Sequence, residues 1–255
     1  MSSKVFKLFN LVLLLTLVLS ACTHIYDSNL PAPEEPQSPV SEVSTSIEPD
    51  TPDQPVFGEE IYNAMKACPD LALNQVCLGH GIFTGDISSS TPGEPAELSA
   101  GQHINLTSTS LDDYSVVVAR LQAPGVDSDF DSLLVLAVGM VDFRFDEIFF
   151  GCDEINQNLP RIQFSSSNVT DGETQLQSGI VIVNESDDDL LSVEVNGVGL
   201  TLGSSAVITS QPNGEMKVHM RTGTVVASAN GETVPASAGE QVTVPMTAES
   251  KPSAV

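Results

Sequence analysis

The feature that most constrains the fold is an alternation of apolar and polar residues that glycine turns interrupt at short intervals. A period of two residues places successive side chains on opposite faces of an extended chain, so it predicts β-strands. A first set of expected strands covers residues 102–107, 114–121, 132–138 and 141–145. A second set covers 179–183, 191–195, 198–202, 206–210, 215–221, 223–229 and 241–244.

Two of these strands show how the pattern divides buried from exposed side chains. Residues 133–138 are continuously apolar, which predicts a central strand. In the next strand Val141, Phe143 and Phe145 should share the buried face, with Asp142 and Arg144 on the other. One short helix is expected, over residues 59–66, near the start of the first strand set.

Many short strands joined by turns such as Asn196-Gly197 predict an all-β fold. We expect two β-sandwich or barrel-like modules, over residues 57–155 and 156–247, and a disordered tail over 248–255. Residues 22–56 should form a disordered tether, because residues 23–56 carry seven prolines, seven acids and no lysine or arginine.

The N-terminus has the residue pattern of a secretory signal peptide. Lys4 and Lys7 precede an apolar run over residues 8–19, which is too short for the ~20 residues that a membrane span needs. The run ends in Leu19-Ser-Ala-Cys22, which resembles the lipobox of bacterial lipoproteins. That resemblance implies cleavage before Cys22, acylation of its sulfur, and a cell-membrane protein held by lipid on the extracytoplasmic face.

The charge of the chain restricts its partners. The formal net charge is −25, and it becomes −27 once Lys4 and Lys7 leave with the signal. Such a chain repels phosphate backbones, so nucleic-acid binding is excluded as a function class. The expected partners are the membrane, through acyl chains on Cys22, and an envelope protein or glycan.

Three cysteines remain besides Cys22, in keeping with an oxidising compartment. Cys68 and Cys77 are the natural disulfide pair, because the loop between them is short. Cys152 is then left over, and we expect it to be a buried thiol.

One acidic segment invites a calcium hypothesis. Asp127, Asp129 and Asp131 have the spacing of a calcium loop, but Ser132 and Val138 stand where an EF-hand needs Gly and Glu. A solvated acidic loop is the simpler interpretation, and a looser calcium site is the alternative. No other cofactor is expected.

A second candidate site is a small basic stripe. If residues 215–221 form a strand, Lys217, His219 and Arg221 share its outward face. This stripe could receive an anion or the carboxylates of a partner. Cross-strand pairing with acids of the same chain is the simpler account.

Residues 192–246 resemble the extracytoplasmic β domain of FecR-type proteins. The resemblance rests on the glycine turns and alternating valines of 193–208, 216–226 and 234–244. The first strand set is similar to repeats in surface proteins of filamentous bacteria such as Chloroflexota. FecR regulators also carry a cytoplasmic anti-sigma segment and a transmembrane helix, which we do not find here, so the resemblance implies a β domain rather than sigma-factor signalling.

These observations together favour a non-catalytic, lipid-anchored envelope protein that acts as a binding or scaffolding module. No Gly-x-Ser-x-Gly, His-Glu-x-x-His or phosphate-cradling motif is present. The alternatives are an envelope hydrolase that uses a carboxylate pair and a calcium-dependent adhesion module.

Overall fold

The structure is a computed structural model of the 255-residue chain that describes residues 44–46, 58–87, 91–108, 114–125, 131–148, 159–171, 174–176, 178–186, 189–249 and 251–253. Nearly all regular structure in these residues is β, and one helix, α2 (Gly58–Ala67), precedes the long strands. The all-β class and the short helix are therefore confirmed.

Nineteen strands are described. Those up to residue 147 are β1 (Ser44–Ser46), β2 (Gln75–His80), β3 (Ile82–Gly85), β4 (Pro95–Glu97), β5 (His103–Thr107), β6 (Val116–Ala123), β7 (Asp131–Val138) and β8 (Met140–Glu147). Those that follow are β9 (Arg161–Ser167), β10 (Val169–Asp171), β11 (Thr174–Leu176), β12 (Gly179–Asn184), β13 (Leu191–Val195), β14 (Val198–Leu202), β15 (Ser205–Ser210), β16 (Glu215–Thr222), β17 (Thr224–Ala229), β18 (Glu232–Ser237) and β19 (Gln241–Pro245).

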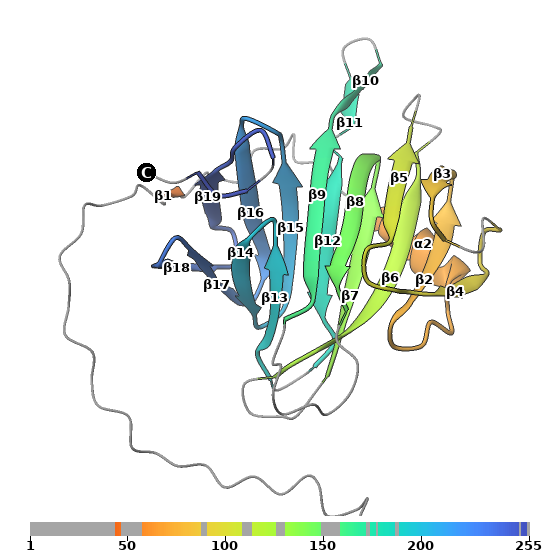
Figure 1. The fold of residues 1–255 in the computed structure, drawn as a ribbon, viewed down its shortest axis with the longest axis horizontal. Helices are drawn as coiled ribbons and strands as arrows, with labels where there is room; N and C mark the ends of the chain where they lie inside the picture. Colours follow the sequence, from red (N-terminus) through yellow and green to blue (C-terminus); the bar gives the residue numbers. More distant parts are fainter. Residues whose placement is uncertain are drawn as a thin grey trace, which may run out of the picture. The chain divides into compact units, whose positions relative to one another are not determined.

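Two large sheets contain most of these strands (Figure 1). The nine-stranded sheet has the order β1-β19-β16-β15-β12-β7-β6-β2-β4, and the eight-stranded sheet has the order β18-β17-β14-β13-β9-β8-β5-β3. A separate hairpin joins β10 to β11. The described pairs are antiparallel except β13 with β9, which are parallel.

The two strand sets meet in both large sheets. In the nine-stranded sheet β7 pairs with β12, and in the eight-stranded sheet β9 lies between β8 and β13. One hydrophobic cluster contains buried residues from both sets and both sheets, including Phe145, Ile180 and Val218. The sequence left open whether the two sets pack together; they form one β-sandwich around one shared core.

The predicted division of side chains is confirmed in the central strands. Val141, Phe143 and Phe145 are at most 1% exposed, while Asp142 and Arg144 face solvent. Strand β7 is buried on both faces, as its continuous apolar run predicts.

Helix α2 covers part of the outer face of the nine-stranded sheet. Ala64 belongs to a second hydrophobic cluster with Val116, Val118 and Leu136 of that sheet. The helix approaches β2 so closely that a Cβ on Gly79 would lie 2.7 Å from that of Ala64. Next to it the predicted Cys68–Cys77 disulfide joins the end of α2 to β2.

Two of the Asn-Gly turns form as predicted. Asn196 and Gly197 have φ angles of 53° and 78°, and Asn230 and Gly231 have φ angles of 52° and 84°. Two successive positive φ angles define the hairpin turn that matches the twist of its strands.

Two segments expected to be disordered contain ordered residues. Ser44–Ser46, within the expected tether, pairs with β19 as strand β1. At the other end, the backbone of Ser253 donates to the Pro245 carbonyl at 3.0 Å, so residues 251–253 correct the expectation of a disordered tail. This part of the tail is ordered because its polar backbone groups find partners on the loop after β19. The rest of the tether lies outside the described residues. Among the residues that the structure describes, no helix is long and apolar enough to cross a membrane.

Candidate mixed-charge site

The outer face of the eight-stranded sheet carries a network of polar side chains. Period-two alternation directs these side chains away from the core on β5, β8, β9 and β13. At one end His103 Nε2 lies 2.7 Å from Asp142 Oδ1, and the Asn105 amide donates to Asp142 Oδ2 at 3.2 Å. Among the described residues, no helix lies on this face (Figure 1).

The network continues into a cavity of about 670 Å³, which we call the mixed-charge pocket. It contains three of the nine basic residues of the chain and three carboxylates, so its formal charges cancel. The residues that line it are Arg144, Asp146, Glu147, Arg161, Gln163, Glu194, Gly197, Asn230, Lys251 and Pro252.

Arg161, the first residue of β9, connects two of the carboxylates. The strand register places Glu147 of β8 opposite it on one side and Glu194 of β13 opposite it on the other. Arg161 Nη1 lies 3.4 Å from Glu147 Oε1, and Arg161 Nε lies 3.3 Å from Glu194 Oε2. The guanidinium therefore bridges the two strand sets at the point where they meet.

The polar groups around Arg161 are incompletely satisfied. Arg161 Nε and Glu147 Oε2 are both shielded from solvent, and neither makes a hydrogen bond with a described residue. A buried polar atom without a partner costs roughly 1–3 kcal/mol. The Arg161 guanidinium and the Glu147 carboxylate thus each keep hydrogen-bonding capacity, although Arg161 Nε also lies in the long ion pair with Glu194.

Arg144 lies beside this pair on β8. It donates a hydrogen bond to Asp146 and a second one, of 3.1 Å, to Gln163 Oε1 on β9. The hydrogen bond and the charge of Asp146 raise the pKa of the Arg144 guanidinium above its usual value. Arg144 is therefore a permanent cation on this face.

Lys251 and Pro252 belong to the C-terminal strap, residues 251–253, which lines the pocket together with Gly197 and Asn230 of two hairpin turns. The Thr247 backbone N–H donates a 2.8 Å hydrogen bond to the Lys251 carbonyl, and this bond closes a turn that reverses the chain direction. The Ser253 carbonyl accepts a 2.8 Å hydrogen bond from the Asn230 side chain. These contacts bring Lys251 and Pro252 to the edge of the pocket.

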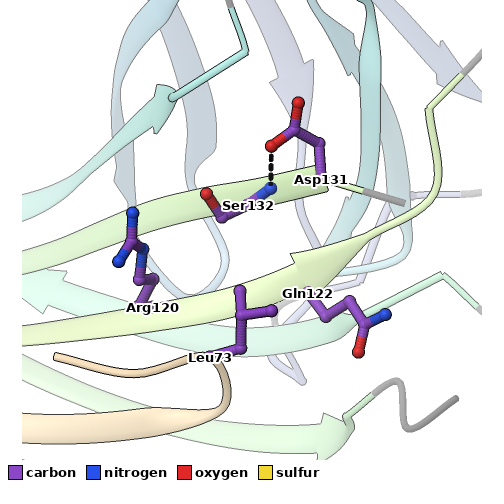
Figure 2. A pocket seen from close by; sticks show the side chains of 5 residues that line it. All are labelled: Leu73, Arg120, Gln122, Asp131 and Ser132. Atoms are coloured by element: carbon purple, nitrogen blue, oxygen red, sulfur yellow. Dashed lines mark hydrogen bonds between the residues drawn. The ribbon is translucent and has the colours of Figure 1, made fainter. Parts of the chain in front are cut away.

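A second cavity, of about 320 Å³, lies where β6 and β7 meet the segment before β2 (Figure 2). It is lined by Leu73, Arg120, Gln122, Asp131 and Ser132. Arg120 lies 2.7 Å from Glu185 and donates to the Leu71 carbonyl at 3.0 Å. Because Arg120 already binds these two groups, we assign it a structural role in fixing the segment before β2.

The calcium hypothesis falls only partly within the described residues. Asp131 begins β7, lines the second cavity and accepts a 2.8 Å hydrogen bond from the Ser132 backbone (Figure 2). Asp127 and Asp129 lie outside the described residues, as do Cys22 and Cys152. No group of three or more His, Cys, Asp or Glu side chains suited to a metal occurs in the described part of the chain.

The basic stripe lies on the other large sheet. Met216, Val218 and Met220 of β16 are fully buried, so Lys217, His219 and Arg221 face outward, as predicted. Lys217 Nζ lies 3.9 Å from Glu215 Oε2, an acid of its own strand rather than the cross-strand partner we expected.

The stripe and the mixed-charge pocket belong to different sheets, so they are separate features. His219 Nδ1 is shielded from solvent and makes no hydrogen bond with a described residue.

Sequence reasoning missed most of the mixed-charge pocket. It placed Arg144 on an outward face but assigned no strand to 161–167, and so missed Arg161 and Gln163. The signal is present, because Ile162 and Phe164 alternate with these polar residues and are buried.

Comparison with known proteins identifies no family. No family model matches the chain, and no curated protein matches it. Two crystal structures of a candidate anti-sigma factor from Parabacteroides distasonis ATCC 8503 share 13% and 14% identity with it, at TM-scores of 0.30 and 0.31. The matches cover 64% and 68% of this chain and 55% of either of those, so the chain spans about half their length. Similarity at this level carries no conclusion about function.

Proposed function

We propose that this chain is a non-catalytic, lipid-anchored protein of the cell envelope that binds a ligand in its mixed-charge pocket. In this proposal Cys22 carries the lipid, residues 23–56 connect it to the sandwich, and the outer face of the eight-stranded sheet is the binding surface. The observation that carries the proposal is the pocket itself, where three of the nine basic residues of a very acidic chain lie together.

The position of the pocket supports a binding role. Its walls come from β8, β9 and β13, whose inward residues Phe145, Ile162 and Val193 are part of the shared core. Polar side chains on strands fixed in this way are held in place before a ligand arrives. Such preorganisation lowers the entropy cost of binding.

The FecR-like interpretation of residues 192–246 belongs to the same proposal. That region supplies Glu194, Gly197 and Asn230 to the pocket, and the remaining walls come from the flanking segments. A FecR-like β domain would thus bind its ligand together with its neighbours in the chain.

The arrangement of the carboxylates favours binding over hydrolysis. Glycosidases place two carboxyl groups on either side of the bond that is cleaved. In this pocket Arg161 lies between Glu147 and Glu194 and pairs with both. The guanidinium occupies the space that a glycosidic bond would need.

Metabolic labelling with an alkyne-tagged fatty acid tests the anchor. We expect label on the wild-type protein and on Cys152→Ser, and none on Cys22→Ser, because only the mature N-terminal cysteine would be acylated. Antibody against the sandwich should also bind intact cells, or spheroplasts if an outer membrane covers it. Equal labelling of Cys22→Ser, or a protein found free in the cytosol, would show that the anchor is wrong.

A further inference from the structure

We propose that the mixed-charge pocket binds a neutral saccharide through its hydroxyl groups. The inference rests on the proposed binding function and assigns its ligand class. It follows from three properties of the pocket, which are its charge balance, its unused hydrogen-bonding capacity and its construction from two strand sets and the C-terminal strap.

The charge balance disfavours ions. Arg144, Arg161 and Lys251 carry three formal positive charges, and the carboxylates Asp146, Glu147 and Glu194 carry three negative ones. An anion would compete with carboxylates already paired to the arginines, and it would approach a chain whose net charge is −25. A cation would in turn compete with the arginines for the same carboxylates. A neutral ligand avoids both conflicts.

The hydrogen-bonding capacity fits hydroxyl groups. Arginine only donates hydrogen bonds and a carboxylate only accepts them, whereas a hydroxyl does both. In this pocket donors and acceptors alternate along β8 and β9, where Arg144 bonds to Gln163 and Arg161 lies opposite Glu147. Neighbouring hydroxyls of a sugar ring could therefore accept from a guanidinium and donate to the adjacent carboxylate.

The incompletely satisfied groups also favour a ligand with hydroxyl groups. Arg161 Nε and Glu147 Oε2 lie beneath the surface of the pocket without hydrogen bonds to described residues. The contacts of Arg161 with Glu147 and Glu194 are long, at 3.4 and 3.3 Å, so they leave hydrogen-bonding capacity that hydroxyls lying against the three side chains could use. Neighbouring hydroxyls of one sugar could supply an acceptor for the Arg161 guanidinium and a donor for the Glu147 carboxylate.

The cavity also has a suitable size and a lining that is not wholly ionic. Its volume of about 670 Å³ lies within the range of roughly 300–1,000 Å³ that is usual for ligand pockets. Gly197 and Pro252 give it a small non-ionic patch against which the C–H groups of a sugar could pack. None of the lining residues is aromatic, so we expect affinity in the millimolar to high micromolar range rather than tight binding.

A glycan array probed with the full-length protein in detergent tests this ligand class. The array carries neutral oligosaccharides of glucose, galactose, mannose and N-acetylglucosamine, alongside sialylated and sulfated ones. Neutral glycans should bind, and saturation-transfer NMR should then place the contact on their ring protons. Binding restricted to the sialylated or sulfated probes, or no binding at millimolar concentration, would overturn the inference.

Two variants locate the site. Glu147→Gln removes the charged acceptor with little change of shape, and Gln163→Ala removes a half-buried amide on the face of β9 that points away from the core. Each should weaken binding by about tenfold, the loss expected for one hydrogen bond to a charged or well-placed group. Glu215→Gln, the same substitution at an exposed carboxylate of β16 on the other large sheet, is the matched control and should bind like the wild type. Unchanged binding in both pocket variants would place the site elsewhere.

The two proposals can fail separately. If Cys22 is unmodified but neutral glycans still bind in the pocket, the anchor is wrong and the ligand class stands. If Cys22 is acylated and no neutral glycan binds, the ligand class is wrong.

Discussion

Asn196 offers the sharpest test of how the two strand sets are joined. It is fully buried in the turn after β13, with a φ angle of 53°. Strand β13 pairs with β9 in parallel only as far as Val195 and Ile162. Beyond that point the Asn196 side chain replaces the missing backbone, because it accepts from the Phe164 N–H at 2.7 Å and donates to the Phe164 carbonyl at 2.9 Å.

The same side chain also reaches the opposite sheet, where its amide donates to Ser210 Oγ of β15 at 2.9 Å. Asn196→Ala removes all three hydrogen bonds and leaves the N–H and carbonyl of Phe164 buried without partners. At roughly 1–3 kcal/mol for each orphaned group, we expect a loss of about 3–5 kcal/mol. The positive φ adds about 1–2 kcal/mol, because alanine is strained in that region.

Urea unfolding of matched variants separates these two contributions. Asn196→Gly loses the hydrogen bonds without the φ strain, so it should be less destabilised than Asn196→Ala by about 1 kcal/mol. Asn213→Ala carries the strain alone, since Asn213 has a φ of 55° in an exposed turn. Equal stability of Asn196→Ala and Asn213→Ala would refute the claim that the Asn196 side chain joins the strand sets.

Three further predictions follow from single contacts. Replacing both Cys68 and Cys77 by alanine should lower the free energy of unfolding, measured in urea, by about 2–3 kcal/mol. The reason is that the disulfide closes a short loop, and its loss gives the unfolded chain more conformational entropy. Gly139→Ala should cost about 2–4 kcal/mol, since φ is 88° and the new Cβ would lie 2.4 Å from Ser178 Oγ. Gly231→Ala is its control, with φ of 84° and nothing within 4 Å, and should cost only about 1–2 kcal/mol. Calcium chelation should leave the melting temperature unchanged if the segment around Asp127 and Asp129 is a solvated acidic loop, and a fall of several degrees on chelation would instead establish a calcium site.

The strand pattern was predictable because it is a local property of the sequence. Phe143 and Phe145 are buried and Asp142 and Arg144 exposed, as alternation alone requires. The turn at Asn196-Gly197 was equally predictable from the sequence, because few residues other than Asn and Gly adopt positive φ without strain. The short helix and the disulfide that follows it also depend on neighbouring residues only.

The pairing of strands was not predictable in the same way. Strand β7 lies next to β12, although more than 40 residues separate their central residues Val135 and Ile182 in the sequence. Nothing local specifies that partner, since any strand with an apolar face could occupy the position. The sequence therefore predicted two strand sets as two modules, but it did not predict that both sets share the same two sheets.

Strand β9 explains why the pocket was missed and why it exists. It starts after a stretch with no strand pattern, and the alternation of Arg161 and Gln163 with Ile162 and Phe164 covers only four residues, the shortest run that predicts a strand. Those two inward residues pack in the shared core, and Asn196 binds the backbone of Phe164 from the next hairpin. The contacts that join the strand sets inside the protein thus fix the outward side chains of the same strand in the pocket. For this reason a variant at Asn196 that still folds should weaken ligand binding as well as stability, whereas Gly139→Ala, in the turn between β7 and β8, should affect stability alone.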